Sequence, residues 1–337
     1  MNSKNLKPGK YYEKHNIPPV GTHNTIPPFS TKMKSGVEVD IDVIRIIGQQ
    51  AGPTLYVGGG IHGDEINGVE AILRLQDQID FNDVKGELIL VPVQNPAGYV
   101  FRSRSNPYDP IDPDWVHPGS PTGAYSKRMK YILNTLASEA DCVIDMHTAG
   151  RGGSNNPMAY TPPEIGNGAG KRSLELSIAF GGDRIIQGDN EEDYGWPVQL
   201  AMPFVAVREG RAGIYPEAGQ GGSGLPEEEY VEYFITGVLN VMKAMGMLDG
   251  EIVDQGERVV VDPLEDGTKT VRTVNGGIFN PVVDNGDSVK KGQLLAEVHS
   301  IPKGIEEIKA PIDGLVIFIR TYGPIEEGGR LISISPP

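Results

Sequence analysis

A histidine and a glutamate stand three residues apart in the glycine-rich segment Gly58-Gly-Gly-Ile-His62-Gly-Asp-Glu65. An apolar run precedes this segment, so we expect a strand to deliver both side chains to a tight loop, where they can converge on one cation. His147 ends another apolar run and offers a second imidazole from a separate strand end. Two imidazoles and one carboxylate are a ligand set of catalytic zinc sites, which leave a fourth position to water. His62, Glu65 and His147 are therefore predicted to hold one Zn²⁺ per chain.

A further carboxylate, Glu217, lies among glycines in Tyr215-Pro-Glu217-Ala-Gly-Gln-Gly-Gly222. These glycines indicate backbone held close to another group, which favours a functional carboxylate. A carboxylate beside a metal-bound water can take its proton and pass it to a leaving group. Asp145 shares a strand face with His147 and can orient that imidazole, although a buried structural salt bridge is an alternative. Simpler interpretations are also open: a solvated loop carboxylate for Glu217 and a hydrogen-bonded core histidine for His147.

Strands and helices that alternate along the chain are expected to position these residues. Buried or alternating apolar runs predict strands, and apolar residues at a spacing of three to four predict helices. This order predicts an α/β domain with a largely parallel sheet, whose functional groups collect at the carboxyl ends of the strands. The predicted strands are 37–47, 54–58, 87–93 and 141–146, and the predicted helices are 68–79, 124–140, 173–180 and 226–247.

Three motifs in order, GGxHGDE, DxH and ExGxGG, resemble the succinylglutamate desuccinylase and aspartoacylase family from about Thr54 to Gly222. The family is related to the zinc carboxypeptidases, so the resemblance implies a zinc-carboxypeptidase-like mixed sheet covered by helices. It also implies a zinc-dependent amidohydrolase that cleaves the linear amide of a small N-acylated amino acid or a related compound. Under this resemblance His62, Glu65 and His147 match the metal ligands, and Glu217 matches the catalytic glutamate.

The resemblance further implies an arginine, located after an Asn-Pro segment, that polarises the scissile carbonyl. Arg104 fits this arginine by its spacing from Asn95-Pro, and Arg102 is the reserve candidate. We expect Asn95 and Arg102 to contact the substrate.

The next family element, Asp-x-Asn-Arg, binds the substrate carboxylate, but this chain has Asp114 and Trp115 in place of the Asn-Arg pair. We expect both residues to line the substrate site. An acid beside an indole suits an ammonium or a neutral group. The sequence therefore predicts a substrate whose amine portion is cationic or lacks a free carboxylate at that subsite. Arg151 is an alternative carboxylate ligand, or else an ordinary surface arginine.

Short β segments separated by glycine turns follow the last predicted helix, and they resemble a biotinyl/lipoyl-like barrel-sandwich domain. We expect residues 1–248 to form the catalytic domain and residues 249–337 a smaller all-β domain. Lys303 lies at the spacing of a carrier lysine but lacks its methionine neighbours, so an unmodified scaffold is predicted. By the family resemblance this domain walls the mouth of the active site and restricts substrates to small molecules.

Charge and composition exclude several classes of partner. The net charge is -15, from 30 basic and 45 acidic side chains, which opposes binding to nucleic acid or an anionic membrane surface. The single cysteine excludes an internal disulfide and a cysteine-based zinc cluster. No apolar run approaches the roughly 20 residues of a membrane span, so we expect a cytoplasmic protein. The family resemblance implies a small N-acyl substrate as the partner, and we also expect a homo-oligomer.

Two other functions are compatible with the same residues. One is a carboxypeptidase-like or aminopeptidase-like peptide hydrolase, which the predicted β domain across the cleft disfavours. The other is a non-catalytic small-molecule-binding protein on the same fold. The complete set of three ligands and Glu217 favours the deacylase, because a pure binding protein needs no base beside a metal.

Overall fold

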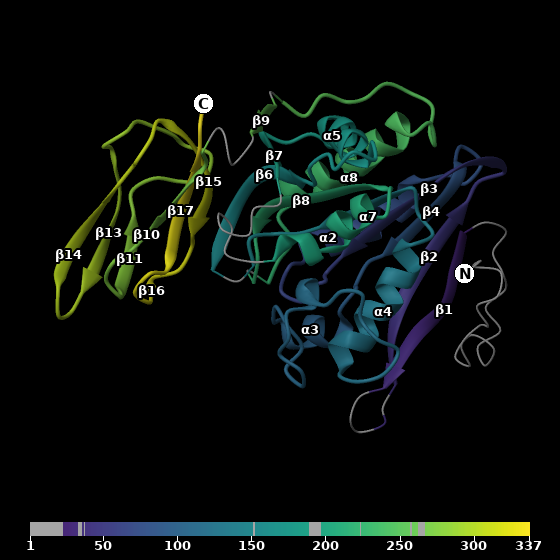
Figure 1. The fold of residues 1–337 in the computed structure, drawn as a ribbon, viewed down its shortest axis with the longest axis horizontal. Coiled ribbons are helices and arrows are strands. Elements are labelled where there is room, and N and C mark those ends of the chain that lie inside the picture. The colour runs from purple at the N-terminus through teal and green to yellow at the C-terminus, as the bar shows by residue number, and fades with distance from the viewer. Residues whose placement is uncertain are drawn as a thin grey trace.

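A computed structural model describes residues 23–32, 36, 38–150, 152–188, 197–222, 224–256, 258–261 and 267–337 of the chain (Figure 1). Arg151, the alternative carboxylate ligand, and residues 1–22 lie outside the described residues. Among the described helices, none is both long and apolar enough to cross a membrane.

One large mixed sheet runs through the molecule in the order β1-β2-β4-β3-β5-β8-β6-β15-β17-β10. Its centre, β4-β3-β5-β8, is parallel, and antiparallel pairs flank it at β2–β4 and β8–β6. The N-terminal strands are β1 (His23–Lys32), β2 (Glu38–Ile47), β3 (Gln50–Gly59), β4 (Lys85–Val91), β5 (Cys142–Met146), β6 (Gly153–Thr161), β7 (Arg184–Gln187), β8 (Ala212–Gln220) and β9 (Val259–Val261).

Helices cover both faces of this sheet because the side chains of its central strands alternate between two apolar cores. Leu55 and Val57 of β3 belong to the core under α2, α5 and α8, whereas Tyr56 belongs to the core under α4 and α7. Figure 1 shows this layered arrangement. The helices are α2 (Asn67–Gln78), α3 (Pro96–Phe101), α4 (Tyr125–Ala137), α5 (Ala169–Phe180), α7 (Met202–Arg208) and α8 (Glu228–Ala244), with 3₁₀ turns η2 (Pro113–Trp115) and η3 (Val198–Leu200).

The C-terminal strands form a β-rich region with its own apolar core. Strands β14-β13-β11-β16 make a separate antiparallel sheet, while β15, β17, β10 and β12 extend the main sheet next to β6. Lys303 is exposed in the turn between β13 and β14. The strands are β10 (Lys269–Arg272), β11 (Gly277–Pro281), β12 (Ser288–Val289), β13 (Leu294–Ser300), β14 (Gly304–Lys309), β15 (Gly314–Arg320), β16 (Pro324–Ile325) and β17 (Arg330–Ser335).

The predicted fold class is confirmed: a mixed sheet covered by helices is followed by a barrel-sandwich-like β region. Four strands of the N-terminal region, β1, β6, β7 and β8, were not predicted. Prolines and glycines interrupt the apolar pattern of β6 and β8, as Pro157 and Pro216 illustrate. Consequently Glu217, which the sequence analysis placed in a loop, lies within strand β8.

Candidate active site

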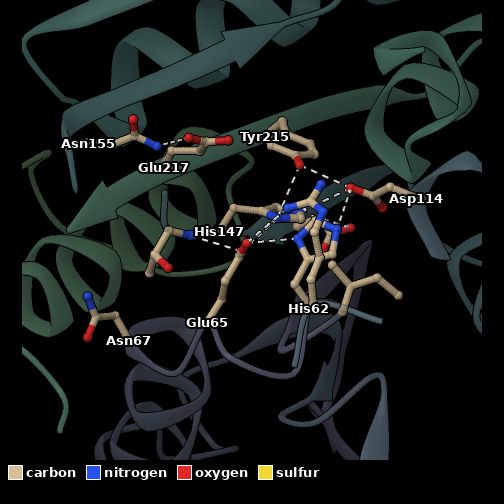
Figure 2. Close-up of polar contacts among 12 residues, drawn as sticks. His62, Glu65, Asn67, Asp114, His147, Asn155, Tyr215 and Glu217 are labelled. Carbon is tan, nitrogen blue, oxygen red and sulfur yellow. Dashed lines mark hydrogen bonds and ion pairs between the residues drawn. The ribbon is translucent and has the colours of Figure 1, made fainter. Parts of the chain in front are cut away.

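The three predicted metal ligands converge at the carboxyl ends of the parallel strands β3 and β5 (Figure 2). Glu65 bridges the two imidazoles, with its Oε1 2.8 Å from Nδ1 of His62 and its Oε2 3.0 Å from Nδ1 of His147. The offered ligand atoms all lie within 4.8 Å of one another, and each side chain is at most 2% exposed. Residues 82 positions apart are thus brought to one point by neighbouring strands.

Close backbone packing explains the glycines of this loop. A Cβ on Gly63 would lie 1.8 Å from the carbonyl carbon of Gly98, so the loop can rest on α3 only with glycine there. Asn95 caps α3 by accepting a hydrogen bond from Gly98 N at 3.0 Å, and it donates to the carbonyl of Ile61 at 3.1 Å. Asn95 therefore braces the ligand loop, and a contact between Asn95 and the substrate stays a prediction.

Carboxylates lie on the Nε2 side of both imidazoles. Oδ1 of Asp112 lies 3.2 Å from Nε2 of His62, and Oδ2 of Asp145 lies 3.6 Å from Nε2 of His147. Burial and Arg104 lower the pKa of His62, but the nearby carboxylates, Glu65 above all, outweigh them and raise it to about 9. The Glu65 carboxylate, which lies between the two Nδ1 atoms, places negative charge where a divalent cation would be held.

Asp114 is fully buried beside the ligand group and already has protein partners. Its Oδ1 lies 3.3 Å from Nζ of Lys130, which is also fully buried, and its Oδ2 accepts a hydrogen bond from the Tyr215 hydroxyl at 3.0 Å. Oδ2 also lies 3.7 Å from Nε2 of His147, and the Tyr215 ring stacks on that histidine at 3.9 Å. These contacts mean that Asp114 would not offer an unpaired charge to a substrate ammonium, which was the sequence-based reason for expecting a cationic substrate.

Glu217 faces the same region from strand β8. A parallel β-bridge joins its backbone to that of His147. The side chain is half-buried and accepts a hydrogen bond from the Asn155 amide on β6 (Figure 2). Burial raises the pKa of Glu217 to about 7, and the charge of Glu65 contributes in the same direction. A carboxyl group that titrates near neutrality can both accept and return a proton.

The glycines that follow Glu217 are required by close packing. A Cβ on Gly221 would lie 2.5 Å from the backbone of Gly150, next to the loop that follows His147. Gly219 has a φ of +87°, and its Cβ would lie 2.4 Å from a carboxylate oxygen of Glu227. The glycines therefore hold the segment after Glu217 against the metal-ligand loops.

The two arginines after Asn95 occupy different surroundings. Nη1 of Arg104 lies 3.5 Å from Oε1 of Glu65, its Nε donates to Asp112 at 2.7 Å, and 44% of the side chain is exposed. Arg102 is exposed at the end of α3, in a left-handed conformation with φ of 49°. Trp115 at the end of η2 is likewise 44% exposed. Arg104 is thus the arginine that reaches the ligand group, which fits the spacing argument.

Comparisons with known proteins agree with this geometry. The family model described as the succinylglutamate desuccinylase/aspartoacylase catalytic domain matches residues 51–245. The chain belongs to this family. The desuccinylase/aspartoacylase match ends one residue after α8, so it covers every strand and loop that carries the ligand group and Glu217.

Individual relatives cover nearly the whole chain. The N-α-acetyl-L-2,4-diaminobutyric acid deacetylase of Halomonas elongata is 26% identical over 87% of this chain and 84% of its own length. A product-bound ectoine utilisation protein EutE (DoeB) from Ruegeria pomeroyi is 26% identical with a TM-score of 0.82, covering 95% of this chain and 98% of its own. A succinylglutamate desuccinylase/aspartoacylase from Rhodobacter sphaeroides has the same fold, with 23% identity, a TM-score of 0.80 and coverage of 93% and 94%.

Sequence reasoning missed the residues that reach the site from unpredicted strands or from a helix face. Lys130 lies on the buried side of α4, four residues after buried Ser126 and three before buried Leu133. A lysine in an apolar stripe is a signal for a buried ion pair, and it was available from the sequence. The position of Asn155 depends on β6, whose pattern is broken by Pro157, and carried no comparable signal.

Proposed function

We propose that this chain is a zinc-dependent deacylase that hydrolyses the amide of a small N-acylated amino acid. The observation that carries this proposal is the convergence of His62, Glu65 and His147 beside Glu217 in a member of the desuccinylase/aspartoacylase family. The name of the Halomonas relative, a deacetylase of an N-acetylated amino acid, supports the same class of reaction.

The donor atoms fit a divalent ion of borderline softness. Two imidazole nitrogens and one carboxylate lie within 4.8 Å of one another, and carboxylates contact the opposite nitrogens of both rings. His62, Glu65 and His147 would hold the ion. When bound there, zinc would supply Lewis-acid activation of water and of the amide carbonyl.

The side chains of the protein are proposed to transfer the proton, stabilise the carbonyl oxygen and hold these groups in position. Glu217, with a pKa near 7, accepts a proton from the attacking water and delivers it to the leaving nitrogen. Arg104 reaches the ligand group with an exposed guanidinium and is proposed to donate hydrogen bonds to the carbonyl oxygen as negative charge develops on it. Asp112 holds both Arg104 and His62 in position.

Residues 1–248 are proposed as the catalytic unit and residues 249–337 as an unmodified β-rich unit. The family model stops at residue 245, and the strands from β10 onward have a separate apolar core, which supports this division. Because β15 pairs with β6 at Phe318–Asn155, the β-rich unit lies beside the strand that contacts Glu217.

The test is hydrolysis of a panel of N-acyl amino acids by the zinc-loaded protein. The panel contains N-α-acetyl-2,4-diaminobutyrate, N-acetyl-lysine, N-acetylaspartate, N-succinylglutamate and a dipeptide of matched size. We expect release of the free amine from at least one acyl amino acid, loss of activity after removal of zinc by a chelator, and recovery on zinc addition. Hydrolysis of the dipeptide alone would favour the peptide hydrolase, and binding without turnover would favour the non-catalytic protein.

A further inference from the structure

The β-rich C-terminal region borders the site through one strand contact. β15 pairs with β6 so that Phe318 lies opposite Asn155, the residue whose amide contacts Glu217. The Phe318 ring packs on Gly153, where a Cβ would lie 2.5 Å from the ring. Side chains of β15 and its neighbour β17 can therefore extend along the same sheet towards Glu217.

Arg330, the first residue of β17, lies across this contact. Its guanidinium carbon stacks 3.7 Å from the centre of the Phe318 ring, and its Nε donates to the Ser333 hydroxyl at 3.2 Å. A hydrogen bond also joins Arg330 to Tyr160 on β6, and the Tyr160 ring meets that of Tyr215 edge-on at 6.0 Å. The guanidinium thus lies on the site side of the β-rich region.

Arg330 differs from the other cations of the site in its partners. Arg104 pairs with Asp112 and Glu65, and Lys130 pairs with Asp114. In the part of the chain that the structure describes, no carboxylate lies within 4.0 Å of the Arg330 guanidinium. Its favourable charge interaction with a carboxylate is a longer-range one, with Glu217. A half-buried guanidinium without a direct carboxylate partner favours an anionic ligand.

The surrounding electrostatics agree with this geometry. Burial lowers the pKa of Arg330, and the charge of Arg330 is close enough to lower the pKa of Glu217. A carboxylate bound at Arg330 would therefore lie near the base that serves the scissile amide. An N-acyl amino acid presents these two groups together, because its amide nitrogen and its carboxylate are attached to the same carbon.

We propose that Arg330 binds the free carboxylate of the N-acyl amino acid, so that the C-terminal β region completes the substrate site. The proposal rests on the deacylase function. It also gives a substitute for the Asn-Arg pair of the family pattern, whose positions hold buried Asp114 and exposed Trp115. A guanidinium fork can bind a carboxylate through two parallel hydrogen bonds, which an ammonium cannot do.

The experiment compares an acid with its amide. kcat and KM are measured for N-α-acetyl-2,4-diaminobutyrate and for its α-carboxamide, in the wild type, Arg330→Met and Arg330→Lys. Arg272→Met is the matched control, because Arg272 pairs with Arg330 in the β10–β17 ladder but is exposed. Methionine keeps apolar contact with Phe318, and zinc content and thermal unfolding verify that each variant is folded.

We expect Arg330→Met to lose about 10- to 100-fold in kcat/KM on the acid, mainly through KM, and less than about threefold on the carboxamide. Arg330→Lys should recover part of the loss, and Arg272→Met should behave as the wild type. Equal losses on acid and carboxamide would overturn the proposal, because they would indicate an effect through Glu217 or the fold. Unchanged kinetics on both would overturn it as well.

A binding measurement separates this proposal from the deacylase function. If the wild type hydrolyses neither compound, the deacylase proposal fails, and calorimetric titration of the zinc-loaded wild type and Arg330→Met with the same two compounds decides the role of Arg330. Binding of the acid that weakens at least about tenfold in Arg330→Met, with carboxamide binding unchanged, supports a carboxylate subsite. Equal affinities in the two proteins, or no binding of the acid by either, contradict it.

Discussion

Two regions of the molecule differ in how their charges are balanced. One is the metal-ligand group, and the other is the part of the β-rich region formed by Arg330 and Phe318, here called the Arg330 wall. In the ligand group, Asp112 pairs with Arg104 and Asp114 pairs with Lys130, so the chain itself supplies the counter-charges. On the wall, Arg330 stacks on Phe318 and has no carboxylate partner within 4.0 Å among the described residues. The first region is therefore organised before any ligand arrives, whereas the second, under our proposal, offers its charge to the substrate carboxylate.

The strongest test of the organised region is removal of Lys130. Because Lys130 and Asp114 are both fully buried, Lys130→Met leaves a buried carboxylate without its cation. We expect the free energy of unfolding to fall by about 3–5 kcal/mol, measured by urea unfolding of the zinc-free protein. Lys127→Met, an exposed change on the same helix, is the control.

Asp114→Asn combined with Lys130→Met sharpens the same test. The double variant removes both charges, so it should regain at least half of the stability that Lys130→Met loses. Additive losses in the double variant would show that the two side chains do not stabilise each other, and the charge-balanced picture of this region would then be wrong.

Glu217 lies between the two regions, and its substitution by glutamine tests the chemistry while the shape of the side chain is kept. Glu217→Gln keeps the size of the side chain and its contact with Asn155, so zinc content and thermal unfolding should match the wild type. Turnover should fall by about 100-fold or more, the contribution of a general acid–base group. Glu229→Gln, an exposed change on α8, is the control. Turnover within a few-fold of wild type would remove Glu217 from the mechanism.

The arginines near the ligand group provide a smaller, paired prediction. Arg104→Met should lower kcat/KM by about 100-fold, because Arg104 is the arginine that reaches Glu65. Arg102→Gln should change kcat/KM by less than about threefold and stability by less than about 0.5 kcal/mol, since the side chain is exposed. The reverse ranking of the two variants would mean that the arginines exchange roles.

The ligand group could be predicted from sequence because its information is local. His62 and Glu65 share one glycine-rich loop, His147 ends a clearly apolar strand, and parallel strands end at a common edge. The protein partners of Asp114 could not be predicted in the same way, because Lys130 lies 16 residues away on α4. A contact between Asp114 and the substrate stays a prediction. The position of Arg330 could not be predicted, because it depends on β6, whose proline and glycine break the strand pattern, and on the pairing of Phe318 with Asn155, 163 residues apart in the sequence.

The central claim, that this chain holds one catalytic zinc at His62, Glu65 and His147, is tested most directly by metal analysis. Elemental analysis and competition with a chelator are applied to the wild type, His62→Ala and His299→Ala, the last being an exposed histidine of the β-rich region. We predict one zinc per chain in the wild type and in His299→Ala, and binding weakened by more than about 100-fold in His62→Ala. A wild type that takes up no stoichiometric zinc, or a His62→Ala variant that binds zinc as tightly as the wild type, would contradict the account.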